Sequence, residues 1–145
     1  YQTVLPNESD LGADLFPTLR RGDVQADVTL VGFGGMLPFV ERAAERLGRE
    51  EELSVEIVAA SLLDPIPRHT LVGLLLDRQR IAVIEESHHE FGVSAELVAS
   101  LAEAGYRGKI IRIGMPPVPI ASARSLERAQ LPDEQTVIDK VLGLF

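Results

Sequence analysis

Four short apolar segments, separated by stretches with helical spacing, constrain the fold of this chain more than any other feature. Each segment is rich in aliphatic residues and is predicted to be a buried strand: Asp27–Val31, Ser54–Ala60, Ile81–Ile84 and Lys109–Ile113. Continuous apolar strands that alternate with helices are typical of a parallel sheet covered on both faces. The sequence therefore predicts an α/β fold, a three-layer α/β/α sandwich with four parallel strands.

Between these strands, apolar residues recur with the period of an α-helix. The first predicted helix follows Gly35, and its apolar face carries Leu37, Val40, Ala43, Ala44 and Leu47. Three more helices are predicted: His69–Asp77, a helix with Leu97, Val98, Leu101 and Ala102 on one face, and a last helix that opens at Pro132–Glu134.

The N-terminal part is less regular. Residues 1–14 are rich in turn-forming side chains and are expected to form an arm or linker ahead of a domain at 15–145. Leu15–Leu19 is a candidate for a fifth strand, followed by a predicted turn at Arg20–Asp23. Because the chain starts without Met, we expect it to be a piece of a longer protein or, as the less favoured alternative, a processed product.

Composition excludes several classes of function. The chain has 14 Lys and Arg against 22 Asp and Glu, a formal charge of −8, which disfavours nucleic-acid binding because phosphate contacts come mainly from cations. Cysteine is absent, which excludes disulfides and thiolate sites. The longest uncharged run, Val28–Val40, is too short to span a bilayer. We therefore expect a cytoplasmic protein that binds neither nucleic acid nor membranes.

Ligands of such sheets gather at the carboxyl ends of the strands, and one end here is the loop Gly32–Gly35. Glycines between a strand and a helix suit an anion. The dinucleotide fingerprint nevertheless needs a third glycine where Leu37 stands, and the second strand ends in Ala59–Ser61 without an acidic residue. A tight turn is the favoured interpretation, and an anion site at Gly32, Gly34 and Gly35 is the weaker one.

A second carboxyl end carries ligand-type side chains at Glu85, Glu86, His88, His89 and Glu90. Their spacing lacks the pair of histidines four residues apart on a helix that metalloproteases use, so no metal site is predicted. Two interpretations stay open: a loop that contacts a partner domain or substrate, and a plain solvated turn. Nearby Ser94 is not a predicted nucleophile, because Glu96 stands where the nucleophile elbow needs glycine.

The segment that follows the fourth strand is rich in proline. Pro116, Pro117 and Pro119 remove three backbone donors and stiffen the chain, and Met115, Val118 and Ile120 make it apolar. Such a rigid arm is either a docking surface for another subunit or a loop folded over its own sheet.

Several pieces of the chain, in their order and spacing, resemble the C-terminal domain of the transketolase family of thiamine-diphosphate enzymes. The resemblance covers Leu15–Phe145 and is strongest to the beta subunit of 2-oxoacid dehydrogenases of the pyruvate or branched-chain type. It rests on Asp27–Met36, Ser61–Ile66, Val83–Glu86, Phe91–Glu96, Pro117–Pro119 and Leu131–Asp133. It implies a five-stranded mixed sheet whose first strand, near Phe16–Arg20, runs antiparallel to the others.

The resemblance also implies a function. In that family the cofactor chemistry belongs to the preceding domains, and the Gly-Asp-Gly motif for diphosphate and magnesium is not in this chain. The domain is therefore expected to bind neither thiamine diphosphate nor Mg²⁺, and to be inactive alone. Its implied role is assembly of dimers and heterotetramers, together with docking of the dihydrolipoyl acyltransferase. The parent enzyme would decarboxylate a 2-oxo acid oxidatively and transfer the acyl group to lipoyl groups.

The residues expected at the interface are Glu86, Phe91, Met115, Pro116, Pro117, Val118, Pro119 and Ile120. His88 and His89 are weaker candidates for general acid–base work, because histidine titrates in the useful range. Two alternatives remain: a C-terminal domain of a transketolase or deoxyxylulose-phosphate synthase, and a stand-alone anion-binding or regulatory module.

Overall fold

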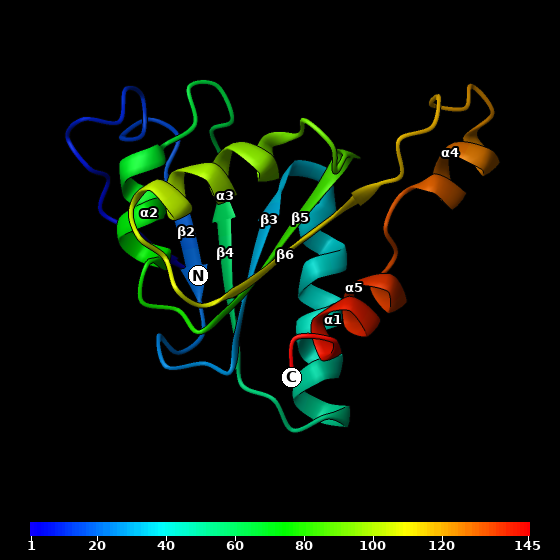
Figure 1. Cartoon of the computed structure of the whole chain (residues 1–145), viewed down its shortest axis with the longest axis horizontal. Coiled ribbons are helices and arrows are strands. Elements are labelled where there is room, and N and C mark those ends of the chain that lie inside the picture. Colours follow the sequence, from blue (N-terminus) through cyan, green and yellow to red (C-terminus); the bar gives the residue numbers. More distant parts are fainter.

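A six-stranded mixed sheet lies at the centre of the computed structural model, which describes residues 1–145 (Figure 1). The strand order is β1-β2-β4-β3-β5-β6. The pairings among β3 to β6 are parallel, and those of β1 with β2 and of β2 with β4 are antiparallel. The strands are β1 (Gln2–Thr3), β2 (Thr18–Arg21), β3 (Val28–Phe33), β4 (Val55–Ala60), β5 (Arg80–His88) and β6 (Lys109–Met115).

The four parallel strands and the antiparallel strand ahead of them are confirmed, but the N-terminal details differ from the prediction. The early strand lies at Thr18–Arg21 rather than at Leu15–Leu19. The predicted turn is wrong for Arg20 and Arg21, which pair with Val58 and Ile57 of β4. Pro17 has no N–H to donate to a ladder, and Gly22, with φ of 101°, turns the chain only after Arg21.

The sheet has six strands rather than five, because β1 adds to the outer edge of β2. Gln2 lies opposite Arg20, and Thr3 lies opposite Leu19. A two-residue strand within a segment rich in turn residues gives no alternating pattern, so sequence periodicity did not indicate it.

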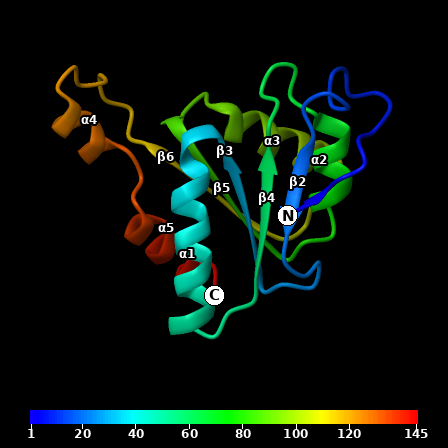
Figure 2. The same ribbon diagram turned by 180° about the vertical axis from the view of Figure 1, so that it is seen from behind.

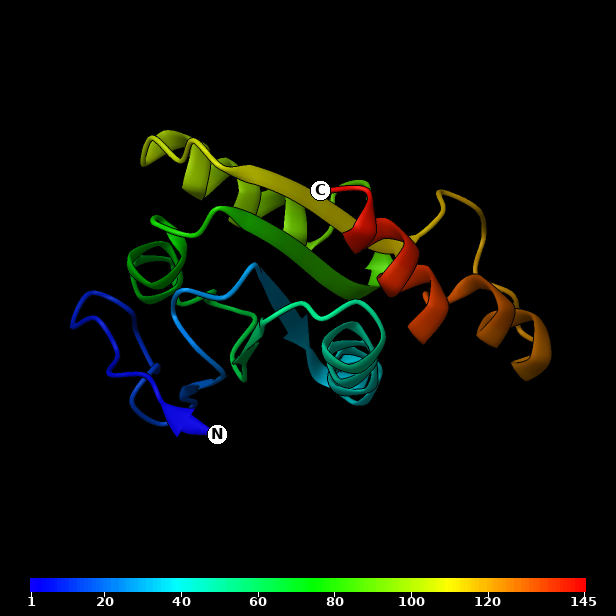
Figure 3. The same cartoon turned by 90° about the horizontal axis from the view of Figure 1, so that it is seen from below.

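Helices cover both faces of the sheet, so the three-layer sandwich is confirmed (Figures 2 and 3). A 3₁₀ turn at Gly34–Met36 leads into the first helix, and no helix is long and apolar enough to cross a membrane. One helix, α4, was not predicted. The helices are α1 (Leu37–Glu50), α2 (Arg68–Leu75), α3 (Val93–Glu103), α4 (Arg124–Gln130) and α5 (Glu134–Leu142).

Alternate residues of the central strands feed two separate cores. Leu30 and Ile57 belong to a cluster that includes buried residues of α1 and α5, whereas their neighbours Val31 and Val58 belong to one shared with α2 and α3. Successive strand residues point to opposite faces, so burial on both sides explains the continuous apolar runs in the sequence.

One carboxylate is wholly buried at the amino end of the sheet. Glu56 of β4 is 0% exposed and accepts hydrogen bonds from Arg78 Nε at 2.6 Å and from the Thr29 hydroxyl at 2.9 Å. Arg20 Nε lies 3.8 Å from the same carboxylate. A buried charge is tolerated only with such partners.

The N-terminal arm is bonded to the rest of the molecule through α2. The Asp10 carboxylate accepts hydrogen bonds from the backbone amides of His69 at 3.0 Å and Thr70 at 2.6 Å, in the first turn of that helix. The Thr70 hydroxyl accepts a bond from the amide of Asn7. Partial burial raises the pKa of Asp10, but the bonds from Thr70 and His69 outweigh it and leave the pKa below its ordinary value.

Candidate functional site

The residues singled out in the sequence meet at the carboxyl edge of the sheet, the upper edge in Figure 1. Parallel pairing places Gly32 of β3 beside Ile84 of β5, and Ile84 beside Ile113 of β6. The glycine turn, the Glu85–Gly92 region and the proline segment therefore begin side by side. Residues from three distant parts of the sequence form one surface, which we call the carboxyl-edge surface.

Glu85 is the buried member of this region. Its side chain accepts hydrogen bonds from the hydroxyls of Ser87 and Ser94 and from the Ser94 amide, and the residue is 2% exposed. No Lys, Arg or His lies within ion-pair distance of it. Ser94 stands in the first turn of α3 and bonds to Glu85, so the structure shows it holding a loop in place.

The strand β5 extends to His88, four residues beyond the predicted strand Ile81–Ile84, so Ser87 and His88 belong to a strand rather than to a loop. Met115 of β6 pairs with His88 beyond an irregularity in the ladder, which lengthens the strand past the two glutamates. Glu86 is exposed and lies against the glycine turn: a Cβ built on Gly35 would stand 2.8 Å from its Oε2. An anion bound at this turn would meet a negative charge, so the geometry gives the anion-site prediction no support.

Both histidines hold the start of the proline segment. His88 Nε2 lies 2.9 Å from the carbonyl oxygen of Val118, and His89 Nδ1 lies 2.9 Å from that of Met115. A carbonyl oxygen only accepts, so each of these nitrogens carries the proton and the other ring nitrogen is left free. The two rings bond to different carbonyls, and the chain contains no group of three or more His, Asp or Glu side chains that could hold a metal ion.

The proline segment leaves the sheet rather than folding over it. Met115 is buried, whereas Pro116 to Ile120 are exposed. Gln130 holds the segment by donating to the carbonyl of Pro119 and accepting from the amide of Ala121. The following helix, α4, has no buried residue and stands away from the sandwich in every view (Figures 1 to 3).

The most exposed aromatic side chain of the molecule is also on the carboxyl-edge surface. Phe91 is 100% exposed and has φ of 59°, a left-handed backbone that bulky residues rarely adopt. It borders a depression of about 550 Å³ lined by apolar residues and by the ion pair of Arg68 with Glu96. Leu63 and Ile66 also line it and were not among the predicted site residues. The signal that indicates them is the position of their loop at the carboxyl end of the strand Val55–Ala60.

Comparisons with known proteins place this fold. The family model for the C-terminal domain of transketolase matches residues 19–137, and the chain belongs to this family. A split-gene transketolase, solved as an inactive beta4 tetramer, has the same fold, with a TM-score of 0.72 at 23% identity; the match covers 88% of this chain and 42% of that one.

The curated relatives point to one branch of the family. The chain is 33% identical over 115 residues to the mitochondrial pyruvate dehydrogenase E1 component subunit beta-1 of Arabidopsis thaliana, covering 77% of this chain and 31% of the relative. It is 28% identical over 120 residues to the corresponding beta subunit of Staphylococcus epidermidis, covering 79% and 35%. The chain thus spans about a third of the length of these relatives. The resemblance to the beta-subunit branch is confirmed.

Proposed function

We propose that this chain is the C-terminal assembly domain of a thiamine-diphosphate-dependent 2-oxoacid dehydrogenase, within a beta subunit of the pyruvate or branched-chain type. The parent enzyme would decarboxylate a 2-oxo acid oxidatively and pass the acyl group to lipoyl groups. The identity of 33% to a pyruvate dehydrogenase E1 beta subunit supports this parentage.

The observation that carries the assembly role is the exposure of Phe91. An aromatic side chain held wholly in solvent on a strained backbone has no role in this chain's own core. Large aromatic side chains dominate the energetics of protein interfaces. With Glu86 and the exposed segment from Pro116 to Ile120, Phe91 would form the contact with neighbouring domains or subunits. Met115, expected at the interface, is buried within this chain and anchors the segment instead.

In this proposal thiamine diphosphate and Mg²⁺ are bound by the other parts of the parent enzyme. The residues at the carboxyl-edge surface do not fit these two groups. No three of its His, Asp or Glu side chains are placed to hold a metal ion together, and the glycine turn faces the Glu86 carboxylate, which would repel a diphosphate. What this chain supplies is positioning: Glu85 fixes one loop from inside, and His88 and His89 fix the proline segment.

Two finer points belong to the same proposal. The charge of −8 supports docking of a basic domain, as the resemblance implies for the dihydrolipoyl acyltransferase. A cytoplasmic location remains a prediction, since plant relatives are named mitochondrial.

The size of the native polypeptide tests the parentage. We expect an antibody against this domain to detect a chain about three times as long as the matched region, because 115 residues make up 31% of the Arabidopsis relative. A band at the 15.8 kDa of this chain would instead favour the stand-alone module. Transketolase activity in the purified parent, without 2-oxoacid dehydrogenase activity, would favour the transketolase alternative.

Replacing Phe91 tests the assembly role. In the full-length enzyme, Phe91→Ser should weaken subunit association by about tenfold or more, as for a central interface aromatic. Leu5→Ser is the control, because Leu5 is an apolar residue that is 89% exposed on the N-terminal arm. Sedimentation of both variants over a concentration series measures the effect, and equal association of the two would overturn the proposal.

A general acid–base role for His88 or His89 stays a prediction. Each ring keeps one nitrogen without a hydrogen bond from this chain, which could exchange a proton with substrate. The His88→Ala/His89→Ala double variant of the full-length enzyme should then lower kcat and change its pH profile. Unchanged kinetics would leave both residues with the positioning role alone.

A further inference from the structure

One border of the sheet has no neighbour. The strand order ends at β6, which pairs only with β5, and Figure 3 shows no strand beyond it. The opposite border is shortened to the two residues of β1. A seven-residue edge strand presents a row of free backbone donors and acceptors, which is a template for another extended chain.

The hydrogen bonds between β5 and β6 show which backbone groups of β6 are free. The amide of Lys109 donates to the carbonyl of Gln79 at 2.9 Å, and the Met115 carbonyl accepts from the amide of His89 at 3.1 Å, so odd-numbered residues of β6 bond toward β5. Backbone groups alternate along a strand. The amides and carbonyls of Ile110 and Arg112 therefore point outward, and no bond within the chain uses them outside the ladder.

This border is basic, although the protein is acidic. None of the ion pairs within 4.0 Å includes Arg80, Arg107, Lys109 or Arg112. Lys109 and Arg80 contact only the carbonyl oxygens of Leu144 and Asp27 through their cationic groups, apart from the stacking of Arg80 on Phe145. The pKa of the Asp27 carboxyl is lowered chiefly by hydrogen bonds from Ser54 and also by the charge of Arg80, and Arg112 donates to the carbonyl of His89. In a chain of charge −8, Arg107, Lys109 and Arg112 are thus three cations around one strand without a carboxylate partner.

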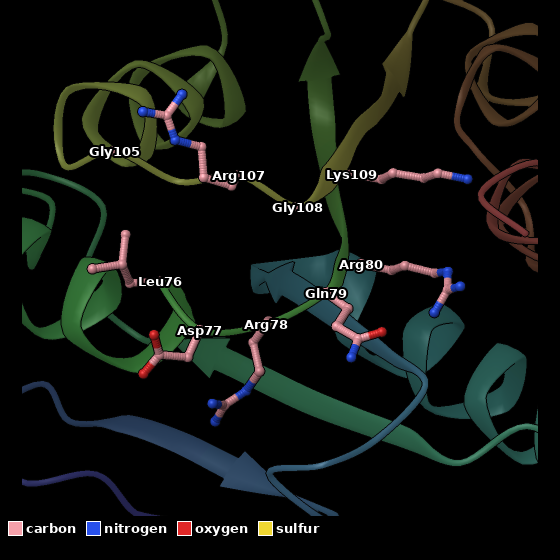
Figure 4. A pocket seen from close by; sticks show the side chains of 9 residues that line it. All are labelled: Leu76, Asp77, Arg78, Gln79, Arg80, Gly105, Arg107, Gly108 and Lys109. Atoms are coloured by element: carbon pink, nitrogen blue, oxygen red, sulfur yellow. The ribbon is translucent and has the colours of Figure 1, made fainter.

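A cavity of about 670 Å³ continues this basic character past the start of β6 (Figure 4). Arg107 and Lys109 extend from either side of Gly108, and Asp77 is the one acidic residue in the lining. Arg78 and Arg80 also line it, but Arg78 is bonded to Glu56, and Arg80 stacks on Phe145 and acts on the Asp27 carboxyl. Arg107 and Lys109 are therefore the cations best placed to meet an incoming carboxylate. The cavity lies at the amino ends of β5 and β6, away from the carboxyl-edge surface.

We propose that the free edge of β6 binds an extended acidic peptide segment of a partner protein by strand addition. Backbone bonds to Ile110 and Arg112 would supply register. Lys109, with Arg107 two residues before it, would recognise carboxylates on alternate side chains of the peptide, which share one face of the sheet. A second copy of this edge fits poorly, because antiparallel pairing of two β6 strands brings the same cations together. The inference does not depend on the parentage proposed above, since it uses neither the carboxyl-edge surface nor a cofactor.

Three labelled octapeptides test the proposal on the full chain at physiological salt. The first alternates Glu and Val, the second alternates Lys and Val, and the third is the Glu–Val peptide N-methylated at alternate residues. We expect fluorescence anisotropy to show binding of the first, with at least tenfold weaker binding of the other two. Equal binding of the methylated peptide would mean that charge attraction alone explains binding, and would overturn strand addition. Failure of the first peptide to bind would also overturn the proposal.

Charge reversal on the protein is the second test of the proposal. Arg107→Glu should weaken binding of the Glu–Val peptide at least tenfold, and because Arg107 is exposed and bonds to no other side chain, the fold should survive. Arg124→Glu on α4 is the matched control, with the same charge change and an expected effect below twofold. Amide exchange should slow at Ile110 and Arg112 when the peptide is bound. Equal weakening by both variants, or unprotected amides at these positions, would contradict the proposal.

Discussion

The carboxylate of Glu85, at the end of the buried part of β5, lies 3.3 Å from the backbone amide of Ser94 in the first turn of α3. The residue that precedes the helix, Gly92, has no side chain to cap it. Glu85 therefore takes over the capping of α3 from a neighbouring strand. Since it also accepts from Ser87, one buried side chain holds both ends of the segment from Ser87 to Ser94, which carries Phe91.

Removing this carboxylate should loosen the loop and destabilise the fold. Glu85→Ala leaves the buried hydroxyl and amide of Ser94 without their acceptor, and removes the bond from the exposed Ser87, so the free energy of unfolding should fall by about 2 kcal/mol. Glu86→Ala is the control, because its exposed side chain has no hydrogen bond within the chain. Chemical denaturation of both variants makes the comparison, and equal stabilities would show that Glu85 is not the acceptor these groups need.

Gly92 should tolerate no side chain. A methyl group there would overlap the carboxylate of Glu85, whereas one at Gly73 of α2 meets nothing within 4 Å. Gly92→Ala should therefore destabilise by about 2 kcal/mol through overpacking. Gly73→Ala should stabilise by about 0.5–1 kcal/mol, because it lowers the entropy of the unfolded chain. Thermal unfolding should shift in opposite directions, and a shared sign would contradict this account of the packing at Gly92.

Neutralising the buried Glu56 should lower the free energy of unfolding by a large amount. Glu56→Gln keeps the shape but leaves Arg78, whose side chain is 12% exposed, without its counter-charge, and breaking a buried pair costs about 3–5 kcal/mol. Glu50→Gln is the matched control on the surface. Hydrogen bonds from Arg46 and Arg49 lower the pKa of Glu50 to about 2, but these side chains lie on the surface, where solvent screens the charges, and the loss of stability should be small. Similar losses in urea denaturation would refute the contrast.

Asp10 makes stability depend on pH. Its pKa lies below the ordinary value in the folded state, so its contribution is present above a pH of about 4 and is lost as the pH falls through the folded pKa. Asp10→Ala should cost about 1 kcal/mol at neutral pH, as for the loss of a helix cap. The stability difference from the parent chain should shrink in acid. The same substitution at exposed Asp14 should give a difference that stays small at every pH.

The fold was largely predictable from the sequence, because strands that are buried on both faces require continuous apolar runs such as Val28–Val31. The ends of elements were less predictable. β5 runs on through Ser87 and His88 because tertiary bonds to Glu85 and to the proline segment hold polar residues in a strand. The burial of Glu56 was equally hidden, since its partner Arg78 is distant in sequence.

For the candidate site, the location of the residues was predictable from the sequence, but their local conformation was not. The sheet rule placed Glu86, His88 and Met115 near one another before any coordinates. It could not show that the histidine rings would bond to carbonyls, nor that Phe91 would be wholly exposed. Both depend on local backbone conformation, such as the positive φ of Phe91, which aromatic residues rarely signal.

The helix α4 has a thermodynamic consequence of its own. Seven residues are too few for a helix to persist in water without packing, and none of these seven is buried. The side chain of Gln130, the last residue of the helix, bonds it to the proline segment at Pro119 and Ala121. Amide exchange over Arg124–Gln130 should therefore be among the fastest of any helix in the free chain and should slow when a neighbour packs on it. The exchange rate of this segment would therefore report the fraction of the protein that is assembled.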